Sequence, residues 1–311
     1  MRRGCRPDSA LLFDFRKGPD MRKTAAVFVA FLFCLSFASF TAAGDAAYTE
    51  TNITIDAGDH AIPATVCLPA GSGPYPAVVL LHGTGSSRDE GYNAFVFAAH
   101  VFAESYGVAS IRIDMMGSGD STADYADYTF ESAVGDTVKA AEYMQSLDAV
   151  GAGRIGVLGW SQGGTDALLS AGRRPDLFKA VVTWAGAPDL SDFLNDERMA
   201  EAQANGYFEL ARGGGRVLRI SLQWCLDVLR TDVLGEFSAF PGPVLAIAGT
   251  DDTDVNPLWA FRIAAANRNP GSRIYLITNA DHTFNLSKEP DKETLLDTIH
   301  VSGEFFAETL R

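Results

Sequence analysis

The chain has 311 residues, of which 47% are hydrophobic and 21% are charged, so it is long enough to bury one large core. Acidic residues outnumber basic ones, and the formal charge at pH 7 is −14. A surface of this sign repels nucleic acid and anionic membranes, which argues against both as partners. We therefore expect one domain of residues 48–311 that acts on a small molecule.

Residues 21–43 have the three regions of a secretory signal peptide: the basic start Met21-Arg22-Lys23, an uncharged apolar run and small residues up to Ala43. The apolar run is short for a membrane-spanning helix, which favours a cleaved signal over a membrane anchor. Residues 1–20 are then an extra leader. We expect a secreted or periplasmic protein with no stable membrane insertion after cleavage. Residues 1–43 hold seven of the 25 Lys and Arg and three of the 39 Asp and Glu, so their removal would leave a charge of −18.

Expected strands and helices alternate along the rest of the chain. Apolar runs bounded by turn residues predict strands at 52–55, 62–68, 77–81, 108–113, 155–158, 180–184, 244–248 and 273–277. Apolar spacings and capping residues predict helices that follow Thr129 and that cover 165–171, 257–266 and 292–310. This alternation predicts an α/β fold, with a mostly parallel eight-stranded sheet and helices on both faces.

Residues 188–241 interrupt the alternation. They are rich in helix formers and aromatic side chains, and they contain the sequence Arg212-Gly213-Gly214-Gly215-Arg216. A segment of this length between two strands is usually a functional insertion such as a lid. Ordinary crossover helices joined by a glycine loop are the alternative. As a lid, the segment would give a substrate pocket its apolar, aromatic wall.

The sequence Gly159-Trp160-Ser161-Gln162-Gly163 fits the pattern G-x-S-x-G. An apolar strand precedes it and a run compatible with a helix follows it, as in a nucleophile elbow that exposes a serine hydroxyl at a sharp turn. The pattern alone is weak in a chain with 30 glycines, and a serine in a glycine-rich turn is the alternative. The context favours Ser161 as a nucleophile.

A serine hydroxyl needs a base to accept its proton, and the base needs a carboxylate to orient it. In sheets with this elbow, the acid and then the histidine follow the serine along the chain. Only His282 and His300 come after Ser161. His300 falls inside the expected last helix, whereas His282 falls in a loop just after a strand. We therefore expect His282 to be the base.

Three aspartates compete for the role of the acid. Asp251, Asp252 and Asp254 all follow the strand at 244–248. Asp252 is favoured because the chain has just cleared the strand there, Asp254 is second and Asp251 third. An acidic loop of this kind can also bind calcium, but this one lacks the glycine and glutamate spacing of a calcium loop.

The oxyanion of an acyl-transfer reaction needs two hydrogen-bond donors, normally backbone N–H groups. One expected donor is Gln162, directly after the nucleophile, and the other is Thr84, which follows His82 and Gly83. Alternatively, this second sequence is merely a turn at the end of a strand. His82 is expected to pack under that loop. Cys67 and Cys225 of the mature chain either form a disulfide or remain buried thiols.

Five motifs stand in the order seen in α/β-hydrolase serine esterases: HGTG, RID followed by GSGDS, GWSQGG, AGTDD and DHTF. Over about residues 50–310 the chain resembles the feruloyl/cinnamoyl esterase-like hydrolases of that superfamily. The resemblance implies the α/β-hydrolase fold, Ser161 as nucleophile, Asp252 as acid and His282 as base. It also implies that Thr84 and Gln162 bind the oxyanion, and that Asp114 and the glycines after it shape the loop beside the site.

The motifs together predict a secreted serine hydrolase that cleaves a small-molecule carboxylic ester through an acyl-enzyme and needs no cofactor or metal. A thioester or polyester hydrolase is the nearest alternative, because the triad is indifferent to the leaving group. A peptidase of the prolyl oligopeptidase type shares the elbow, but such chains normally carry a propeller or another large domain, which these residues do not contain. A non-catalytic binding protein on the same fold is a further alternative. The sequence sets no oligomeric state.

Overall fold

The computed structural model describes residues 47–311, so the predicted leader and signal peptide lie outside the described residues. One sheet has the strand order β1-β2-β4-β3-β5-β6-β9-β10. Its strands are β1 (Tyr48–Asp56), β2 (Ala61–Pro69), β3 (Tyr75–Leu81), β4 (Ala109–Ile113), β5 (Val150–Trp160), β6 (Phe178–Trp184), β9 (Val244–Gly249) and β10 (Arg273–Ile277). Only the pairs β1–β2 and β2–β4 are antiparallel. The predicted eight-stranded, mostly parallel sheet is confirmed.

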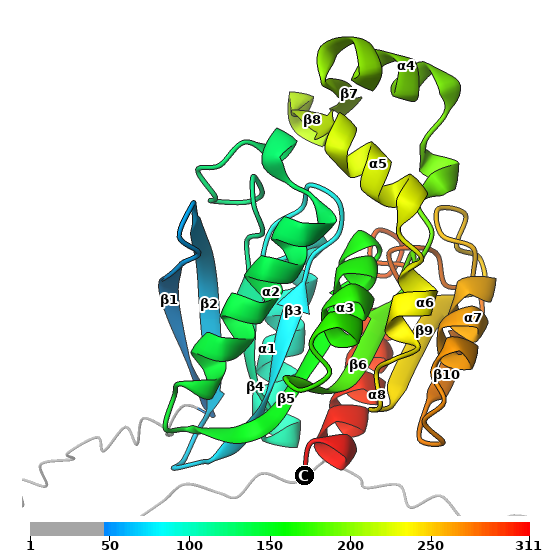
Figure 1. Ribbon diagram of the computed structural model, residues 1–311. Coiled ribbons are helices and arrows are strands. Elements are labelled where there is room, and N and C mark those ends of the chain that lie inside the picture. The colour runs from blue at the N-terminus through cyan, green and yellow to red at the C-terminus, as the bar shows by residue number, and fades with distance from the viewer. Residues whose placement is uncertain (1–46) are drawn as a thin grey trace, which may run out of the picture. The chain divides into compact units, whose positions relative to one another are not determined.

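Helices cover both faces of this sheet (Figure 1). On one face lie α2 (Phe130–Gln145), α3 (Gln162–Arg173), α6 (Val233–Phe237) and α7 (Leu258–Ala266). On the other face lie α1 (Ala94–Tyr106) and α8 (Glu293–Thr309), which contact each other. Each face has its own apolar core, and β3 contributes alternate residues to the two: Val79 and Leu81 to one, Val78 and Leu80 to the other. A continuous apolar run is what a strand covered on both faces requires.

The insertion has two parts. The helices α4 (Asp196–Asn205) and α5 (Leu222–Arg230) and the hairpin of β7 (Tyr207–Ala211) and β8 (Val217–Ser221) lie beyond the carboxyl ends of the parallel strands (Figure 1). We call these elements the cap. The last part, α6, packs between α3 and α7 in the helix layer, as an ordinary crossover helix would.

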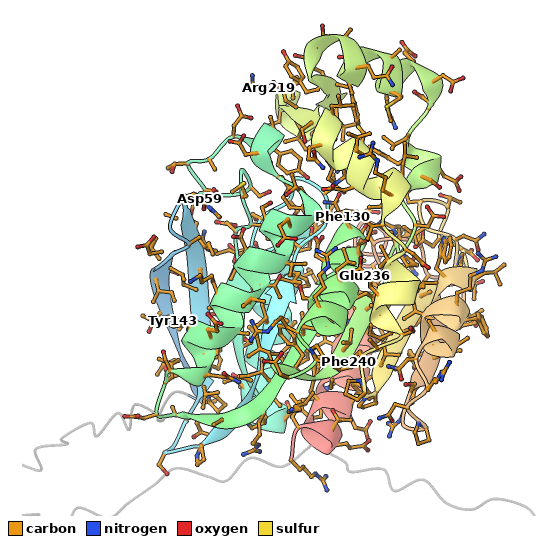
Figure 2. All side chains as sticks on the ribbon, in the orientation of Figure 1. Asp59, Phe130, Tyr143, Arg219, Glu236 and Phe240 are labelled. Carbon is orange, nitrogen blue, oxygen red and sulfur yellow. The ribbon has the colours of Figure 1, made fainter. Side chains whose placement is uncertain are left out.

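The cap rests on the first turn of α2. The Phe130 N–H donates to Asp227 Oδ2 of α5 at 3.2 Å, and the Phe130 ring meets Trp224 of α5 edge-on, with centroids 6.5 Å apart. Phe130 is labelled in Figure 2. Both contacts involve Phe130, the first residue of α2, where the sequence predicted that a helix begins. Thr129 caps this helix by accepting from the Ser132 N–H at 3.1 Å. The cap is thereby held at the strand ends where the site residues emerge.

Cys67 and Cys225 are both buried free thiols, so the disulfide alternative is wrong for this pair. Burial raises the pKa of the Cys67 thiol to about 12 and that of Cys225 to about 11. In residues 47–311, no helix combines the length and the apolar character that crossing a bilayer requires.

Candidate active site

Ser161 lies at the turn between β5 and α3, with φ 55° and ψ −120°. This region of backbone conformation is unusual for a residue with a side chain, and such strain is concentrated at functional sites. Hydrogen bonds hold it: the Ser161 N–H donates to the Trp184 carbonyl at 2.9 Å, and the Ser161 carbonyl accepts from Ala187 at 3.1 Å. The turn has the geometry expected of a nucleophile elbow.

Two glycines make the elbow sterically possible. A Cβ on Gly159 would lie 1.9 Å from the Gly163 carbonyl oxygen, and a Cβ on Gly163 would lie 2.2 Å from the Leu81 carbonyl oxygen. Both neighbours are backbone atoms, which cannot move aside as a flexible side chain can. The glycines of G-x-S-x-G are therefore required by the close approach of α3 to β5 and β3.

His282 and Asp252 come from the loops after β10 and β9. The His282 Nδ1–H donates to Asp252 Oδ2 at 2.8 Å. The other carboxylate oxygen, Asp252 Oδ1, accepts the N–H groups of Asp254 and Val255, each at 2.9 Å. The Asp252 side chain is fully buried and that of His282 is 18% exposed. A buried carboxylate with all its bonds in place fixes one orientation and one tautomer of the imidazole.

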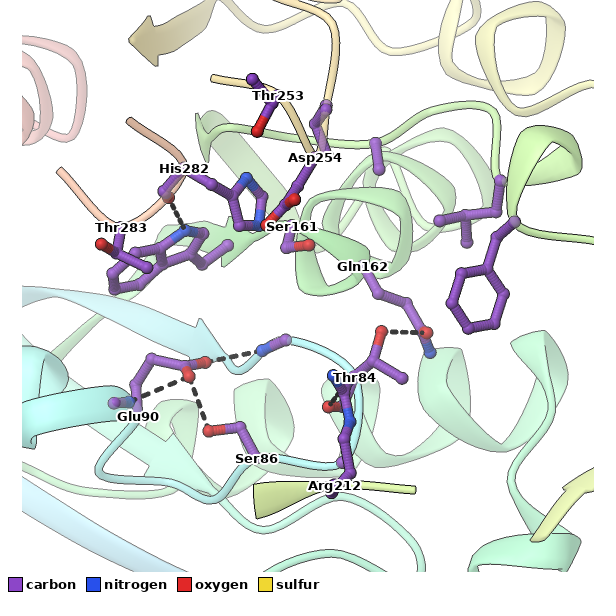
Figure 3. Close-up of a pocket in the computed structure, with 18 of the residues that line it drawn as sticks. Thr84, Ser86, Glu90, Ser161, Gln162, Arg212, Thr253, Asp254, His282 and Thr283 are labelled. Carbon is purple, nitrogen blue, oxygen red and sulfur yellow. Dashed lines mark hydrogen bonds between the residues drawn. The ribbon is translucent and has the colours of Figure 1, made fainter. Parts of the chain in front are cut away.

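The His282 loop lies against the elbow. The Trp160 Nε1–H donates to the His282 carbonyl at 3.1 Å, and Trp160 directly precedes Ser161. Figure 3 shows the His282 ring and the Ser161 side chain next to each other in one cavity, and both residues line it. The structure thus brings together the predicted nucleophile, base and acid.

The pKa of His282 is raised above its ordinary value of 6.5. Burial alone would lower this pKa, because it disfavours the charged imidazolium. The hydrogen bond and the charge of Asp252 act in the opposite direction, and the charges of Asp254 and Glu90 add to them. The carboxylates raise the pKa of His282 by more than burial lowers it.

The raised pKa of His282 predicts how the reaction depends on pH. A base must be neutral, so kcat/KM should rise with pH through the His282 pKa and be lost as the pH falls below it. The rise should lie above the pKa of free histidine. Asp254→Asn removes one of the charges that raise this pKa, and should move the rise to lower pH. The profile of kcat/KM against pH at low ionic strength measures the shift.

Asp251→Asn is the matched control for this profile, since Asp251 is exposed on the same loop and bonds Thr250 rather than His282. Asp251→Asn should leave the profile of kcat/KM against pH at the same position as in wild type. An Asp254→Asn profile that is unmoved or moved to higher pH would contradict this electrostatic account.

The other candidate acids and the other histidine do not bond His282 or Ser161 through their side chains. Asp251 and Asp254 are both exposed, and Asp254 serves Asp252 through its backbone N–H. His300 lies on α8, where its Nδ1 is 3.0 Å from the Tyr106 hydroxyl. In the part of the chain that the structure describes, no three His, Cys, Asp or Glu side chains converge as metal ligands would.

Thr84 and Gln162 line the same cavity as Ser161. The Thr84 hydroxyl donates to Gln162 Oε1 at 2.8 Å, which joins the two residues (Figure 3). Among residues 47–311, no acceptor is found for the backbone N–H of either residue. Gln162 is the first residue of α3, where helix N–H groups have no partner within the helix. Two donors are thus available for an oxyanion.

The loop with Thr84 is supported from below. His82 is 1% exposed, its Nδ1–H donates to the Gly83 carbonyl at 2.8 Å, and its Nε2 accepts from the Met115 N–H at 3.3 Å. Asp114 is buried beside it, where it accepts from Asp120 N–H at 3.0 Å and pairs with Arg88. Both residues have the supporting positions expected for them.

Glu90 is a site residue that the sequence pattern did not indicate. Its Oε2 accepts the Gly83 N–H at 2.6 Å and its Oε1 accepts the Ser86 hydroxyl at 2.6 Å, which pins the loop with Thr84 from the cavity side (Figure 3). Its φ of 56° is positive. Glu90 belongs to no recognised sequence motif. Its contact with Gly83, seven residues earlier, depends on a turn that the sequence does not indicate.

The cavity has a volume of about 1010 Å³. Its floor is the elbow and the loops with Thr84 and His282. Its walls come partly from the insertion, including Phe193 and Trp224, and partly from residues 253–259 after β9. Two other apolar residues of the insertion, Phe208 and Leu218, are buried, and both belong to the apolar core on the α2 and α3 face of the sheet. The segment therefore contributes aromatic walls, as expected, and its buried residues extend that core.

Three comparisons place this geometry among known proteins. Residues 93–300 match the prolyl oligopeptidase family. The chain is similar to 2,6-dihydropseudooxynicotine hydrolase of Paenarthrobacter nicotinovorans, with 36% identity over 135 residues, which is 42% of this chain and 33% of that protein. The chain thus spans about a third of the length of this relative.

Solved structures share the fold at low sequence identity. Est1E of Butyrivibrio proteoclasticus with ferulic acid bound has a TM-score of 0.70 and 21% identity, over 83% of this chain and 99% of that one. The monoacylglycerol lipase of Paleococcus ferrophilus has a TM-score of 0.63 and 18% identity, over 80% of this chain and 99% of that one. These similarities show the α/β-hydrolase fold that the motifs predicted.

Proposed function

The chain belongs to the prolyl oligopeptidase family and is a serine hydrolase with the α/β-hydrolase fold, and on this premise we propose that it cleaves carboxylic esters of small molecules. One observation carries the proposal: the fully buried Asp252 bonds His282 at 2.8 Å beside Ser161, which the elbow holds in a strained turn. This arrangement can generate a serine nucleophile at neutral pH.

The proposed reaction has two steps. His282 accepts the Ser161 proton while the hydroxyl attacks the ester carbonyl, and the backbone N–H groups of Thr84 and Gln162 stabilise the oxyanion. The C–O bond of the ester breaks, and the alcohol leaves with the proton from His282. Water, deprotonated by the same histidine, then attacks the acyl-enzyme, and Ser161 regains its proton as the acid departs.

The size and the lining of the cavity favour a small-molecule substrate. A cavity of about 1010 Å³ is at the upper end of the range for drug-sized ligands. Its aromatic side chains Phe193 and Trp224 suit an apolar or aromatic portion of an ester. The fold neighbour Est1E was solved with ferulic acid bound, which is consistent with this substrate class.

Hydrolysis assays test the proposal. The purified chain should release product from p-nitrophenyl acetate, p-nitrophenyl butyrate, p-nitrophenyl octanoate or methyl ferulate, and the order of kcat/KM across the series should follow the fit of the acyl group to the cavity. Prolyl and alanyl peptide p-nitroanilides, assayed in parallel, should give a lower kcat/KM than the best ester.

A peptidase is the second candidate, because the family match favours it. It would replace the ester proposal if a peptide p-nitroanilide gave a higher kcat/KM than every ester and if Ser161→Ala abolished that activity. Esters and anilides that are all left intact would contradict both candidates.

A further inference from the structure

We propose that the substrate carries a carboxylate, which binds between Arg212 and Arg216 at the tip of the β7–β8 hairpin. Both side chains line the cavity above Ser161. The inference rests on the proposed ester hydrolysis and adds the chemical class of the substrate. It depends on how the hairpin places two guanidinium groups, and on what surrounds them.

The register of the hairpin places the two arginines opposite each other. The last pair within the strands is Ala211 and Val217, so Arg212 and Arg216 are the next pair, and the Arg212 N–H donates to the Arg216 carbonyl at 2.8 Å. Residues directly opposite in an antiparallel pair have side chains on the same face. Only three glycines, 213–215, close the tip, so no side chain of the tip separates the two.

Neither guanidinium has an acidic partner within the described residues. Arg212 donates from Nη2 to the Thr84 carbonyl at 2.6 Å, and this is its one side-chain hydrogen bond there. The Arg216 side chain makes none with any described residue, and no described carboxylate lies within 4.0 Å of either group. The neighbouring Arg219 differs, since it pairs with Asp124.

Two like charges placed opposite each other destabilise a hairpin unless an anion lies between them. The planar guanidinium group matches a carboxylate in two parallel hydrogen bonds. A third arginine at the cavity is already engaged: Arg198 lies over the Phe193 ring at 4.3 Å. Arg212 and Arg216 thus place two positive charges without a described carboxylate partner side by side at the hairpin tip, in a chain whose formal charge is −14.

The contact with Thr84 fixes where the anion would lie. Thr84 is the expected oxyanion donor, so the Arg212 guanidinium contacts the loop that is expected to bind the oxyanion. Figure 3 shows Arg212 next to Thr84, and Asp254 on the other side of Ser161 near His282. Glu90, Asp189 and Asp192 also line the cavity, but no carboxylate of the lining lies within 4.0 Å of either guanidinium. A substrate carboxylate a few bonds from the ester would reach the arginines.

Matched ester pairs test this inference. Monoethyl adipate differs from ethyl hexanoate in that a carboxylate replaces the terminal methyl of the acyl chain, and 5-(butanoyloxy)pentanoate differs in the same way from pentyl butanoate on the alcohol side. In at least one pair, wild type should prefer the anionic ester by about tenfold in kcat/KM, as a charge-assisted hydrogen bond would give. Arg216→Gln should abolish the preference, mainly through KM.

Arg230→Gln is the control, because Arg230 is exposed on α5 of the same cap and does not line the cavity. It should keep the preference. Arg216 is chosen over Arg212 because the loss of the Arg212 bond to Thr84 would also slow neutral esters. A preference that is absent from both pairs, or that survives in Arg216→Gln, would overturn the inference.

Binding without turnover separates this inference from the proposed function. Calorimetric titration of monoethyl adipate and of 5-(butanoyloxy)pentanoate into Ser161→Ala should show binding of at least one, and the double variant Ser161→Ala/Arg216→Gln should lose about tenfold in affinity. That result supports the carboxylate site even if wild type hydrolyses no ester. Equal affinity of both variants for both probes, or no binding at all, would refute the site while neutral ester hydrolysis could still stand.

Discussion

His282→Ala is expected to lower kcat on the best ester substrate by about 10⁵- to 10⁶-fold, and Ser161→Ala should cost as much. The reason is that the two residues act as one unit: without a base the hydroxyl stays protonated, and without the hydroxyl the base has nothing to activate. The double variant should therefore be no slower than either single variant. Stopped assays at high enzyme concentration measure the residual rate.

His300→Ala is the matched control, because His300 is the other histidine after Ser161 and lies on α8 beside Tyr106. It should retain wild-type kcat within about threefold, since it contacts nothing in the cavity. A His282→Ala enzyme that kept kcat within tenfold of wild type would show that another group is the base.

Asp252→Asn has the second largest expected effect, a fall in kcat of about 10⁴-fold. An amide at this position keeps the shape of the side chain, but it carries no charge and can stabilise the wrong tautomer of His282. The 2.8 Å bond to Nδ1 would then leave the imidazole unable to accept the Ser161 proton. The measurement is kcat for variants whose circular dichroism spectra match that of wild type.

Asp254→Asn discriminates between the two leading candidates for the acid. Its exposed carboxylate raises the His282 pKa from a distance, and its backbone N–H bond to Asp252 does not depend on the side chain. Asp254→Asn should therefore stay within about tenfold of wild type at alkaline pH. If Asp254→Asn were the slower of the two variants, the assignment of Asp252 would be wrong.

The sheet could be predicted because its strands are encoded locally. The run of apolar residues in β3 and in β9 has no polar interruption, and turn residues bound both strands. The helix α1 was not predicted, and its sequence AFVFAAHVFAESY explains why: apolar residues occur all round it, so no single face gives a helical period. It also begins after Asn93, which has φ 61° and makes no side-chain capping bond.

The sequence could predict those residues of the candidate site that directly follow strands of the sheet. Loops after β3, β5, β9 and β10 meet at one edge of a parallel sheet, so Thr84, Ser161, Asp252 and His282 were expected to meet there. The choice among the three aspartates depends on a turn in which two N–H groups bind Asp252 Oδ1. Glu90 and the arginine pair depend on a strained turn and on a hairpin register, which no local pattern specifies.

The measurement that tests the central claim most directly is covalent labelling with a fluorophosphonate, followed by mass spectrometry of the peptides. This probe reacts with an activated serine whatever its natural substrate is. The account predicts one modified residue, Ser161, with labelling abolished in Ser161→Ala and strongly slowed in His282→Ala. A wild-type chain that stays unlabelled, or one labelled at another serine, would contradict the assignment of Ser161 as the nucleophile.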